Sequence, residues 1–157
     1  MSNASSLLKT CYLRFTSAAS ALQSPFLLIV RLYWGWQLIQ TGWGKLHNIP
    51  HVTEFFTSLG IPFPGLNARF VSTTELVGGI LLGIGLFSRP VALLIAADMF
   101  VAYWTDGHEQ LFSFFSDPGK FYSYDAYTFL VAALLILILG AGKISVDHLI
   151  GIERAKT

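Results

Sequence analysis

The sequence predicts an all-α integral membrane protein: a four-helix bundle with two short amphipathic helices at the membrane interface. Of its 157 residues, 54% are hydrophobic and 12% are charged, and the mean hydropathy is +0.59. A soluble domain of this length is much less apolar. Four apolar stretches approach the roughly 20 residues that a spanning helix needs. They leave only tails and connections outside, so we expect any activity to lie in the bundle or on its loops.

Residues 1–24 are predicted to form a cytoplasmic amphipathic tail. Lys9 and Arg14 interrupt its apolar stretch, which therefore lacks the continuous core of a signal peptide. Apolar residues recur there with helical spacing, at Leu8, Cys11, Tyr12 and Phe15. This pattern is typical of a helix lying in the membrane surface. The sequence has one cysteine, Cys11, which excludes a disulfide within the chain.

A transmembrane domain is expected at residues 25–142. Its four spans are predicted at about residues 25–46, 66–87, 89–105 and 125–139. The first opens at Pro25, where the missing N–H of proline is harmless. In the first outer loop, residues 50–59 carry an apolar stripe and are followed by Gly60. This spacing predicts the second amphipathic helix, ended by the glycine.

Lysine and arginine near the span ends predict the orientation. One side of the membrane would carry Lys9, Arg14, Arg89, Lys143, Arg154 and Lys156. The other side would carry Lys45, Arg69 and Lys120, together with most of the acidic loop residues. We therefore expect both termini, including a second tail at residues 143–157, to be cytoplasmic.

Three charged residues, Arg31, Glu75 and Asp98, lie within the expected spans. At 1.5 Å per residue, each lies about 9–13 Å from the end of its span, so the three could share one layer. Glu75 shares a helix face with Gly79 and Gly83, a spacing that lets helices approach closely. One interpretation is a structural Arg31–Glu75 ion pair with Asp98 as a second acceptor. The other is a polar pocket for a quinone headgroup, a proton or a small solute.

The outer end of the first span supplies candidates for the mouth of such a pocket. They are Gln37, Gln40, Trp43 and Lys45. Trp43 is typical of an interfacial aromatic belt, and Lys45 of an anchor that extends to the interface. A lysine at a pocket mouth could also hold an anionic substrate.

Histidine and carboxylate side chains occur together around the first outer loop. His51 and Glu54 are three residues apart on the expected loop helix, and His47 precedes it. These residue types suit zinc, copper or iron, but a solvated polar face is the simpler explanation of them. The second outer loop is rich in Phe and Tyr, which is typical of a loop lying on the bilayer or of a docking surface.

Several motifs resemble the DoxX family of small four-span bacterial membrane proteins over about residues 25–150. They are Arg31-Leu32, Gly42-Trp43-Gly44-Lys45-Leu46, Phe55-Phe56…Leu59-Gly60-Ile61-Pro62, Glu75-Leu76-Val77-Gly78-Gly79…Gly85-Leu86, Ser88-Arg89 and Gly140…Gly142-Lys143…Ser145-Val146-Asp147. The resemblance implies a bacterial inner-membrane location and an association with membrane redox processes. The segment Trp34-Gly35-Trp36-Gln37…Lys45 further resembles a branch encoded beside copper-binding modified peptides.

These observations favour an accessory protein of a redox or metal-stress pathway that binds quinone or relays protons at Arg31, Glu75 and Asp98. As an enzyme it would be the membrane subunit of a quinone-linked oxidoreductase, and its candidate cofactors are quinone and copper. One alternative is a scaffold or maturation factor for a partner peptide; another is a small proton-coupled transporter. We expect the lipid bilayer, a protein partner on either face or a second copy as partners, and no nucleic acid.

Overall fold

In the computed structural model, which describes residues 2–152 and the side chains of residues 8–152, regular structure is entirely helical. The helices are α1 (Ser2–His47), α2 (Ile49–Ser58), α3 (Pro64–Ile84), α4 (Ser88–Thr105), α5 (His108–Phe112), α6 (Pro118–Tyr122), α7 (Ala126–Leu139) and α8 (Val146–Leu149). Arg154 and Lys156, which were counted for orientation, lie outside the described residues.

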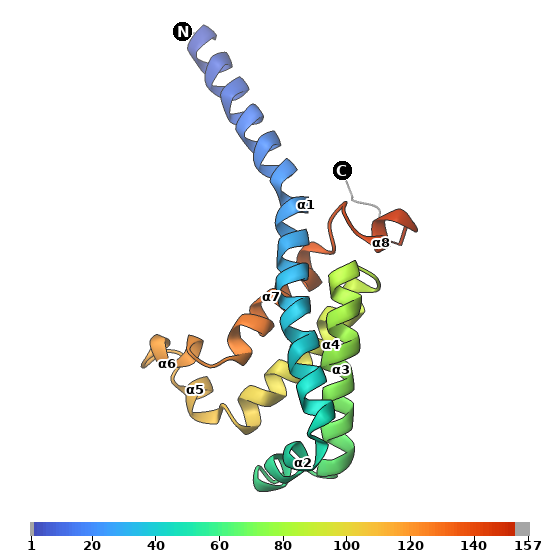
Figure 1. The fold of residues 1–157 in the computed structure, drawn as a ribbon. Helices are drawn as coiled ribbons and strands as arrows, with labels where there is room; N and C mark the ends of the chain where they lie inside the picture. Colours follow the sequence, from blue (N-terminus) through green and yellow to red (C-terminus); the bar gives the residue numbers. More distant parts are fainter. Residues whose placement is uncertain (1, 153–157) are drawn as a thin grey trace.

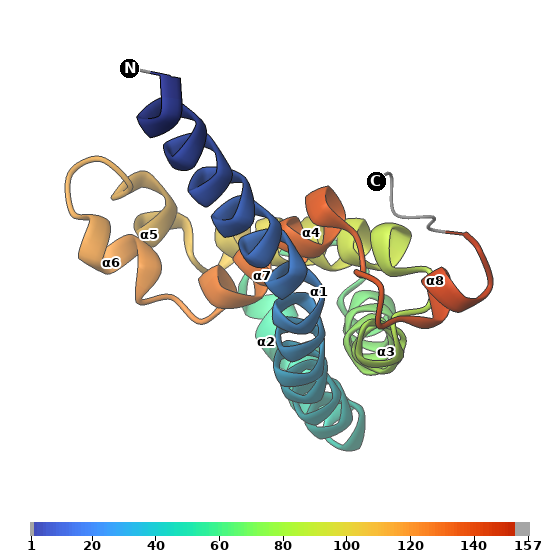
Figure 2. The same ribbon diagram turned by 90° about the horizontal axis from the view of Figure 1, so that it is seen from above.

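Two helix pairs form the bundle. The C-terminal half of α1 packs against the antiparallel α3, and α4 packs against α7 (Figure 1). Seen from above, α3 is nearly end-on beside α1, and α4 and α7 run across the picture (Figure 2). Helix α2 lies at one end of the α1–α3 pair and α8 lies near the other end of α3 (Figure 1). The core is apolar and includes Leu38, Leu82, Ile95, Tyr103 and Ile136.

Glycines allow α1 and α3 to pack backbone against backbone. A Cβ added to Gly35 would lie 2.8 Å from the carbonyl oxygen of Gly79 and 3.2 Å from the amide nitrogen of Gly83. A Cβ on Gly42 would lie 2.8 Å from the carbonyl oxygen of Ser72. Real Cβ atoms rarely approach so closely, so the predicted glycine face of α3 is confirmed as the contact with α1.

The N-terminal segment differs from the prediction, because α1 is one helix of 46 residues that continues through Pro25. Residues 8–23 of this helix are almost all exposed, and the segment extends away from the bundle (Figure 1). Proline removes one helical hydrogen bond. The alanines and leucines before Pro25 favour helix strongly enough to maintain it across this position.

Helices occupy all four expected spans, and α2 occupies the expected loop helix. Among the described helices, only α1 is long and apolar enough, at Leu8–His47, to cross a membrane by itself; α7 is apolar but shorter. Glu75 and Asp98 lower the apolar character of α3 and α4. The crossing of the bilayer by these three helices therefore stays a prediction.

Candidate functional site

A cavity of about 910 Å³ lies between the C-terminal end of α1, helices α2, α3 and α4, and the start of α7. Its walls are mainly apolar, and they include Leu38, Phe55, Phe56, Phe70, Leu94 and Met99. Four acidic residues also line it: Glu75 and Asp98, which are buried or partly buried, and Asp106 and Asp125, which are exposed. We name it the carboxylate cavity. Its volume falls within the range of about 300–1,000 Å³ that small-molecule sites occupy.

Glu75 is the most buried charged residue in the cavity wall, with 3% of its surface exposed. Its Oε1 accepts a hydrogen bond from Nζ of Lys45 at 2.5 Å. Its Oε2 is buried and has no hydrogen-bond partner among the described residues. Half of this carboxyl group's hydrogen-bonding capacity is therefore available to a molecule in the cavity.

Asp98, on α4, also has a carboxyl oxygen without a hydrogen-bond partner in the described part of the chain. This oxygen, Oδ2, is buried. Its carboxyl group lies close enough to Glu75 and Lys45 to interact electrostatically with both. Besides the exposed Asp106 and Asp125, the cavity thus holds one ammonium donor and two carboxyl groups that each have an unused buried oxygen.

The expected Arg31–Glu75 pair is wrong: the structure pairs Glu75 with Lys45. The contacts of Gly35 and Gly42 with α3 place Arg31 level with Gly85, about ten residues or about 15 Å along the helix from Glu75. Helical side chains also lean toward the N-terminus of their own helix. In antiparallel helices Arg31 and Glu75 therefore lean apart, whereas Lys45 leans into the bundle toward Glu75.

Arg31 is instead fully buried near the other end of the bundle. Its guanidinium donates to the carbonyl oxygen of Leu82 at 3.4 Å and to that of Ile144. These bonds join α1 to α3 and to the segment after α7. Arg31 therefore connects three parts of the backbone and does not contribute to the carboxylate cavity.

Asp147 makes a second set of contacts at this end that the sequence did not reveal. Its two carboxylate oxygens accept from the amides of Phe87 and Ser88, each at 2.8 Å. Its own amide donates to the carbonyl oxygen of Gly85 at 2.9 Å. Phe87 has a φ of 49°, which is uncommon for a residue with a side chain, and Asp147 stabilises that turn at the start of α4.

We name two sets of contacts together the clasp: those of Arg31 with Leu82 and Ile144, and those of Asp147 with Gly85, Phe87 and Ser88. The resemblance motif Ser145-Val146-Asp147 was the one signal in the sequence that pointed to this segment. Its partner residues lie about 60 positions earlier in the chain, beyond the reach of local patterns.

The expected pocket-mouth residues separate into two groups. Lys45 lines the cavity, but Gln37, Gln40 and Trp43 do not. Trp43 is exposed and packs against His47, and Gln37 donates to the hydroxyl of Tyr33 at 3.5 Å. Their positions on α1 turn them away from α3, because Lys45 shares the buried face and they do not.

The proposed metal ligands are not brought together. Nδ1 of His47 lies 2.9 Å from the carbonyl oxygen of Trp43, one turn earlier on α1. His51 lines the cavity, whereas Glu54 is exposed on α2 and does not. Among the described side chains, no group of three or more His, Cys, Asp or Glu residues is placed to hold a metal ion.

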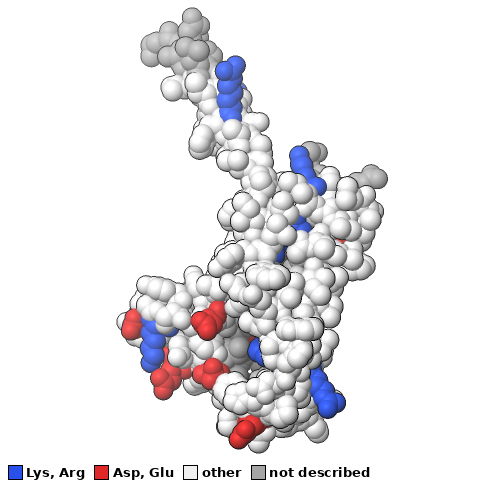
Figure 3. Space-filling view, viewed as in Figure 1, with Lys and Arg blue, Asp and Glu red and all other residues white. Residues whose placement is uncertain are grey.

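Tyr124 completes the rim of the cavity beside α7. Its hydroxyl donates to Oδ2 of Asp106 at 2.8 Å, and both residues line the cavity. Burial, and after it the hydrogen bond to Asp106, raises the pKa of Tyr124. The hydroxyl is therefore a stable neutral donor at the rim. Figure 3 shows most visible Asp and Glu side chains at this end of the molecule, formed by α2, α5 and α6.

The sequence is similar to known membrane proteins. A sequence model of the DoxX family matches residues 26–108, which is more than half of the chain. The chain is also similar to the inner membrane protein YphA of Escherichia coli (strain K12): identity is 28% over 135 residues, covering 82% of this chain and 92% of that protein. No solved structure matches significantly. The chain belongs to the DoxX family of membrane proteins.

Proposed function

We propose that the protein is an inner-membrane accessory protein of a redox or metal-stress pathway, and that its carboxylate cavity binds a quinone or quinol. The observation that carries this proposal is the pair of buried carboxyl oxygens, one each on Glu75 and Asp98, without partners in an apolar cavity. Buried polar atoms normally have partners, and exceptions in a native structure often mark binding sites.

The polar groups of the cavity match a quinone headgroup in number and kind. A quinone carbonyl accepts hydrogen bonds, and Nζ of Lys45 is a donor. A quinol hydroxyl donates, and Oε2 of Glu75 and Oδ2 of Asp98 are acceptors. Apolar walls suit the ring and tail. The same carboxyl groups could exchange the protons that a quinol releases when a separate redox partner takes its electrons.

Native mass spectrometry in mild detergent, after incubation with ubiquinone, tests this binding. We expect the wild type to retain the quinone and Glu75→Gln to lose most of it, because glutamine replaces an acceptor oxygen with a donor. Glu54→Gln is the matched control, since Glu54 is exposed on α2 and does not line the cavity. Equal retention by all three proteins, or by none, would contradict the proposal.

We further propose that α1, α3, α4 and α7 cross the inner membrane with both termini cytoplasmic. The distribution of lysine and arginine supports this topology. Cys11 provides a direct test, because it is exposed and is the chain's one cysteine. A membrane-impermeant maleimide should label Cys11 only after spheroplasts are permeabilised. A cysteine placed at the exposed Ser116, in a Cys11→Ser background, should be labelled without permeabilisation; the reverse pattern would overturn the topology.

A scaffold or maturation role has one observation in its favour. Phe112 and Phe115, in the segment around α5 and α6, are 65% and 92% exposed. Aromatic side chains at this exposure suit a docking surface. A photoreactive phenylalanine analogue at position 115 tests this role, with the exposed Leu93 on α4 as the control position. A defined protein adduct at 115 and only lipid adducts at 93 would support the role; lipid adducts at both would contradict it.

A further inference from the structure

A long exposed surface runs along α1, away from the carboxylate cavity. Throughout Leu8–His47, a stretch of 40 residues, exposed side chains recur at alternating intervals of four and three residues, and we name this line the heptad stripe. Its d positions are Leu8, Phe15, Leu22, Ile29, Trp36 and Trp43. Its a positions are Tyr12, Ala19, Phe26, Tyr33, Gln40 and His47. Among the described side chains of α1, the large apolar ones that are exposed off the stripe are Leu13 and Leu32.

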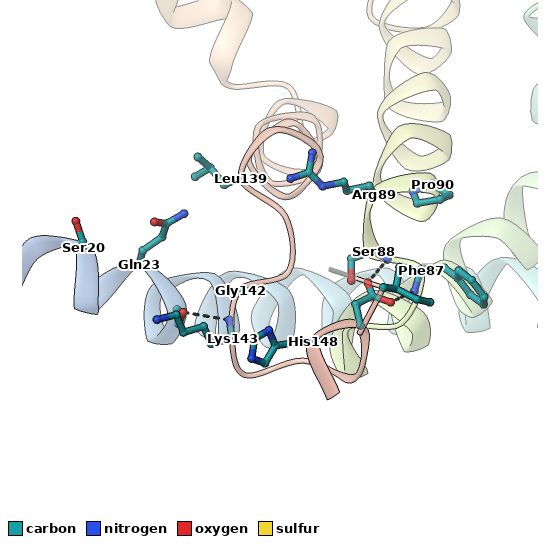
Figure 4. Close-up of a pocket in the computed structure, with 13 residues that line it drawn as sticks. Ser20, Gln23, Phe87, Ser88, Arg89, Pro90, Leu139, Gly142, Lys143 and His148 are labelled. Atoms are coloured by element: carbon teal, nitrogen blue, oxygen red, sulfur yellow. Dashed lines mark hydrogen bonds between the residues drawn. The ribbon is translucent and has the colours of Figure 1, made fainter. Parts of the chain in front are cut away.

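The heptad stripe lies on the face of α1 that the bundle does not use. Among the described residues of α1, those that are buried all lie off the stripe: Leu27, Val30, Arg31, Gly35, Leu38 and Gly42. The segment after α7 also contacts α1 off the stripe, since the amide of Lys143 donates to Oγ of Ser24 at 3.1 Å (Figure 4). The fold of one chain therefore leaves the stripe open from Leu8 to His47.

A strict seven-residue repeat is typical of a helix that packs along another helix. Three or four heptads with apolar a and d positions indicate a coiled coil, and this stripe continues for about five. On a straight α-helix such a stripe drifts by about 20° per heptad, so its residues stay in one contact when two helices wind around each other. Lipid tails contact every exposed side of a spanning helix and select no such repeat. The period therefore favours a second helix over lipid as the occupant of the stripe.

The N-terminal part of α1 needs a partner outside the bilayer. The 40 residues of Leu8–His47 form a helix about 60 Å long, twice the thickness of a hydrocarbon core of about 30 Å. Because α1 continues through Pro25, its first turns cannot lie in the membrane surface while its C-terminal half spans the bilayer, as the proposed topology requires. Tyr12, Phe15 and Leu22 are nevertheless 65–71% exposed there. Helices in water gain most of their stability from packing of an apolar face, so this segment requires a helix or surface to pack against.

Gln40 gives an independent indication of a protein partner within the bilayer. It is exposed and lies about 10 Å along the helix from the end of α1 at His47. In membrane proteins, the glutamine side chain hydrogen-bonds across helices instead of facing hydrocarbon. At an a position of a parallel coiled coil, a polar residue meets its equivalent in the second helix. An amide carries both donors and an acceptor, so Gln40 is complementary to Gln40 of an identical chain.

We propose that two copies of this chain pair through the heptad stripe as a parallel coiled coil. Copies inserted in the same orientation present α1 in parallel, so equivalent residues face each other. The six aromatic residues of the stripe are 52–71% exposed. At about 150–250 Å² for each fully buried aromatic side chain, they would bury roughly 500–900 Å² on each copy, which matches the roughly 800 Å² per partner of a stable interface. Lys9 and Arg14 lie off the stripe, so pairing brings neither charge into the contact.

Disulfide cross-linking in native membranes tests this pairing. In a Cys11→Ser background, a single cysteine replaces Phe15 or Leu22, both at d positions, or Ser17, which is exposed on the opposite face of α1. Paired d positions of a parallel coiled coil lie within the Cα separation of about 4.4–6.8 Å that a disulfide needs, whereas residues on the outer faces lie far beyond it. After brief oxidation we expect about tenfold more dimer from Phe15→Cys and Leu22→Cys than from Ser17→Cys. Co-expression of two differently tagged copies identifies the cross-linked partner.

A second measurement places charge in the contact. Native mass spectrometry in mild detergent should show a dimer for the wild type and for the control Ser17→Glu, and a monomer for Phe15→Glu/Leu22→Glu. These positions lie outside the bundle, and circular dichroism melting of each variant verifies that the bundle is folded. Absent or equal cross-linking at positions 15, 17 and 22, cross-linking to a different protein, or the same subunit number in the wild type and the double variant would overturn the proposal. Neither readout depends on quinone binding, because no residue of the stripe lines the carboxylate cavity.

Discussion

Both ends of the bundle bury charged side chains, but they use them differently. In the clasp, the charged groups of Arg31 and Asp147 are bound to backbone carbonyls and amides of neighbouring segments. In the carboxylate cavity, Glu75 and Asp98 each keep one buried oxygen without a partner among the described residues. Bonds to fixed backbone groups stabilise a fold, whereas unused buried acceptors beside a cavity are available to a ligand. Burial of a charge therefore does not by itself distinguish structure from function; its partners do.

The largest expected effect comes from removing the clasp arginine. Arg31→Met should lower the free energy of unfolding by about 3 kcal/mol, because the carbonyls of Leu82 and Ile144 lose charged donors. Reversible unfolding in sodium dodecyl sulfate, followed by circular dichroism, measures this. The folded fraction should still bind quinone with wild-type affinity. A stable Arg31→Met protein that has lost quinone binding would show that Arg31 serves ligand binding and not the stability of the clasp.

A smaller effect is expected where the helices approach most closely. Gly42→Ala should cost about 1–3 kcal/mol of stability, because the new Cβ would lie 2.8 Å from the carbonyl oxygen of Ser72 and 2.9 Å from Cα of Leu76. Gly44→Ala is the control, since a Cβ there meets nothing within 4 Å. The same unfolding assay compares them. Equal stability of the two variants would show that α1 and α3 do not pack as described.

Asp147→Asn tests the other half of the clasp. An asparagine amide offers one acceptor oxygen in place of two and lacks the charge that favours a helix start, so we expect a loss of about 1 kcal/mol. Asp117→Asn is the comparison: Asp117 accepts from the amide of Lys120 at the start of the short, exposed α6. Thermal melting of both should show the larger decrease for Asp147→Asn. A larger decrease for Asp117→Asn would contradict the role assigned to the clasp.

The smallest effect is the coupling between Lys45 and Glu75. The double-mutant cycle of Lys45→Met and Glu75→Gln should give a coupling free energy of about 0.5–1 kcal/mol. This value is modest because the lysine side chain is 35% exposed. The parallel cycle of Arg31→Met and Glu75→Gln should be additive within about 0.5 kcal/mol, as expected for distant residues. Coupling in the second cycle and none in the first would show that Glu75 pairs with Arg31 and not with Lys45.

The sequence was sufficient to locate the four main helices and α2 and to identify the family. Apolar stretches located the four main helices, and the spacing of Gly79 and Gly83 identified the face of α3 that packs on α1. The motifs that resembled the DoxX family are confirmed as that family by the match over residues 26–108. These features depend on local composition and periodicity, which a single sequence contains.

The partners of the buried charges could not be predicted in the same way. Depth estimates treated Arg31, Glu75 and Asp98 as points on helix axes, and they ignored the direction in which each side chain leans. Including that direction would have favoured Lys45 as the partner of Glu75. The contact between Asp147 and Phe87 spans 60 positions and depends on how the C-terminal segment folds back, for which no local pattern exists.

Infrared difference spectroscopy of the carboxyl groups, recorded on addition of a short-chain ubiquinol, tests most directly whether a ligand uses the unpaired oxygens of the carboxylate cavity. We predict shifted carboxyl bands in the wild type, loss of one set of bands in Glu75→Gln and of the other in Asp98→Asn, and a wild-type spectrum for Glu54→Gln. Identical difference spectra in the wild type and the two cavity variants would show that the ligand does not contact Glu75 or Asp98, and would contradict the proposed site.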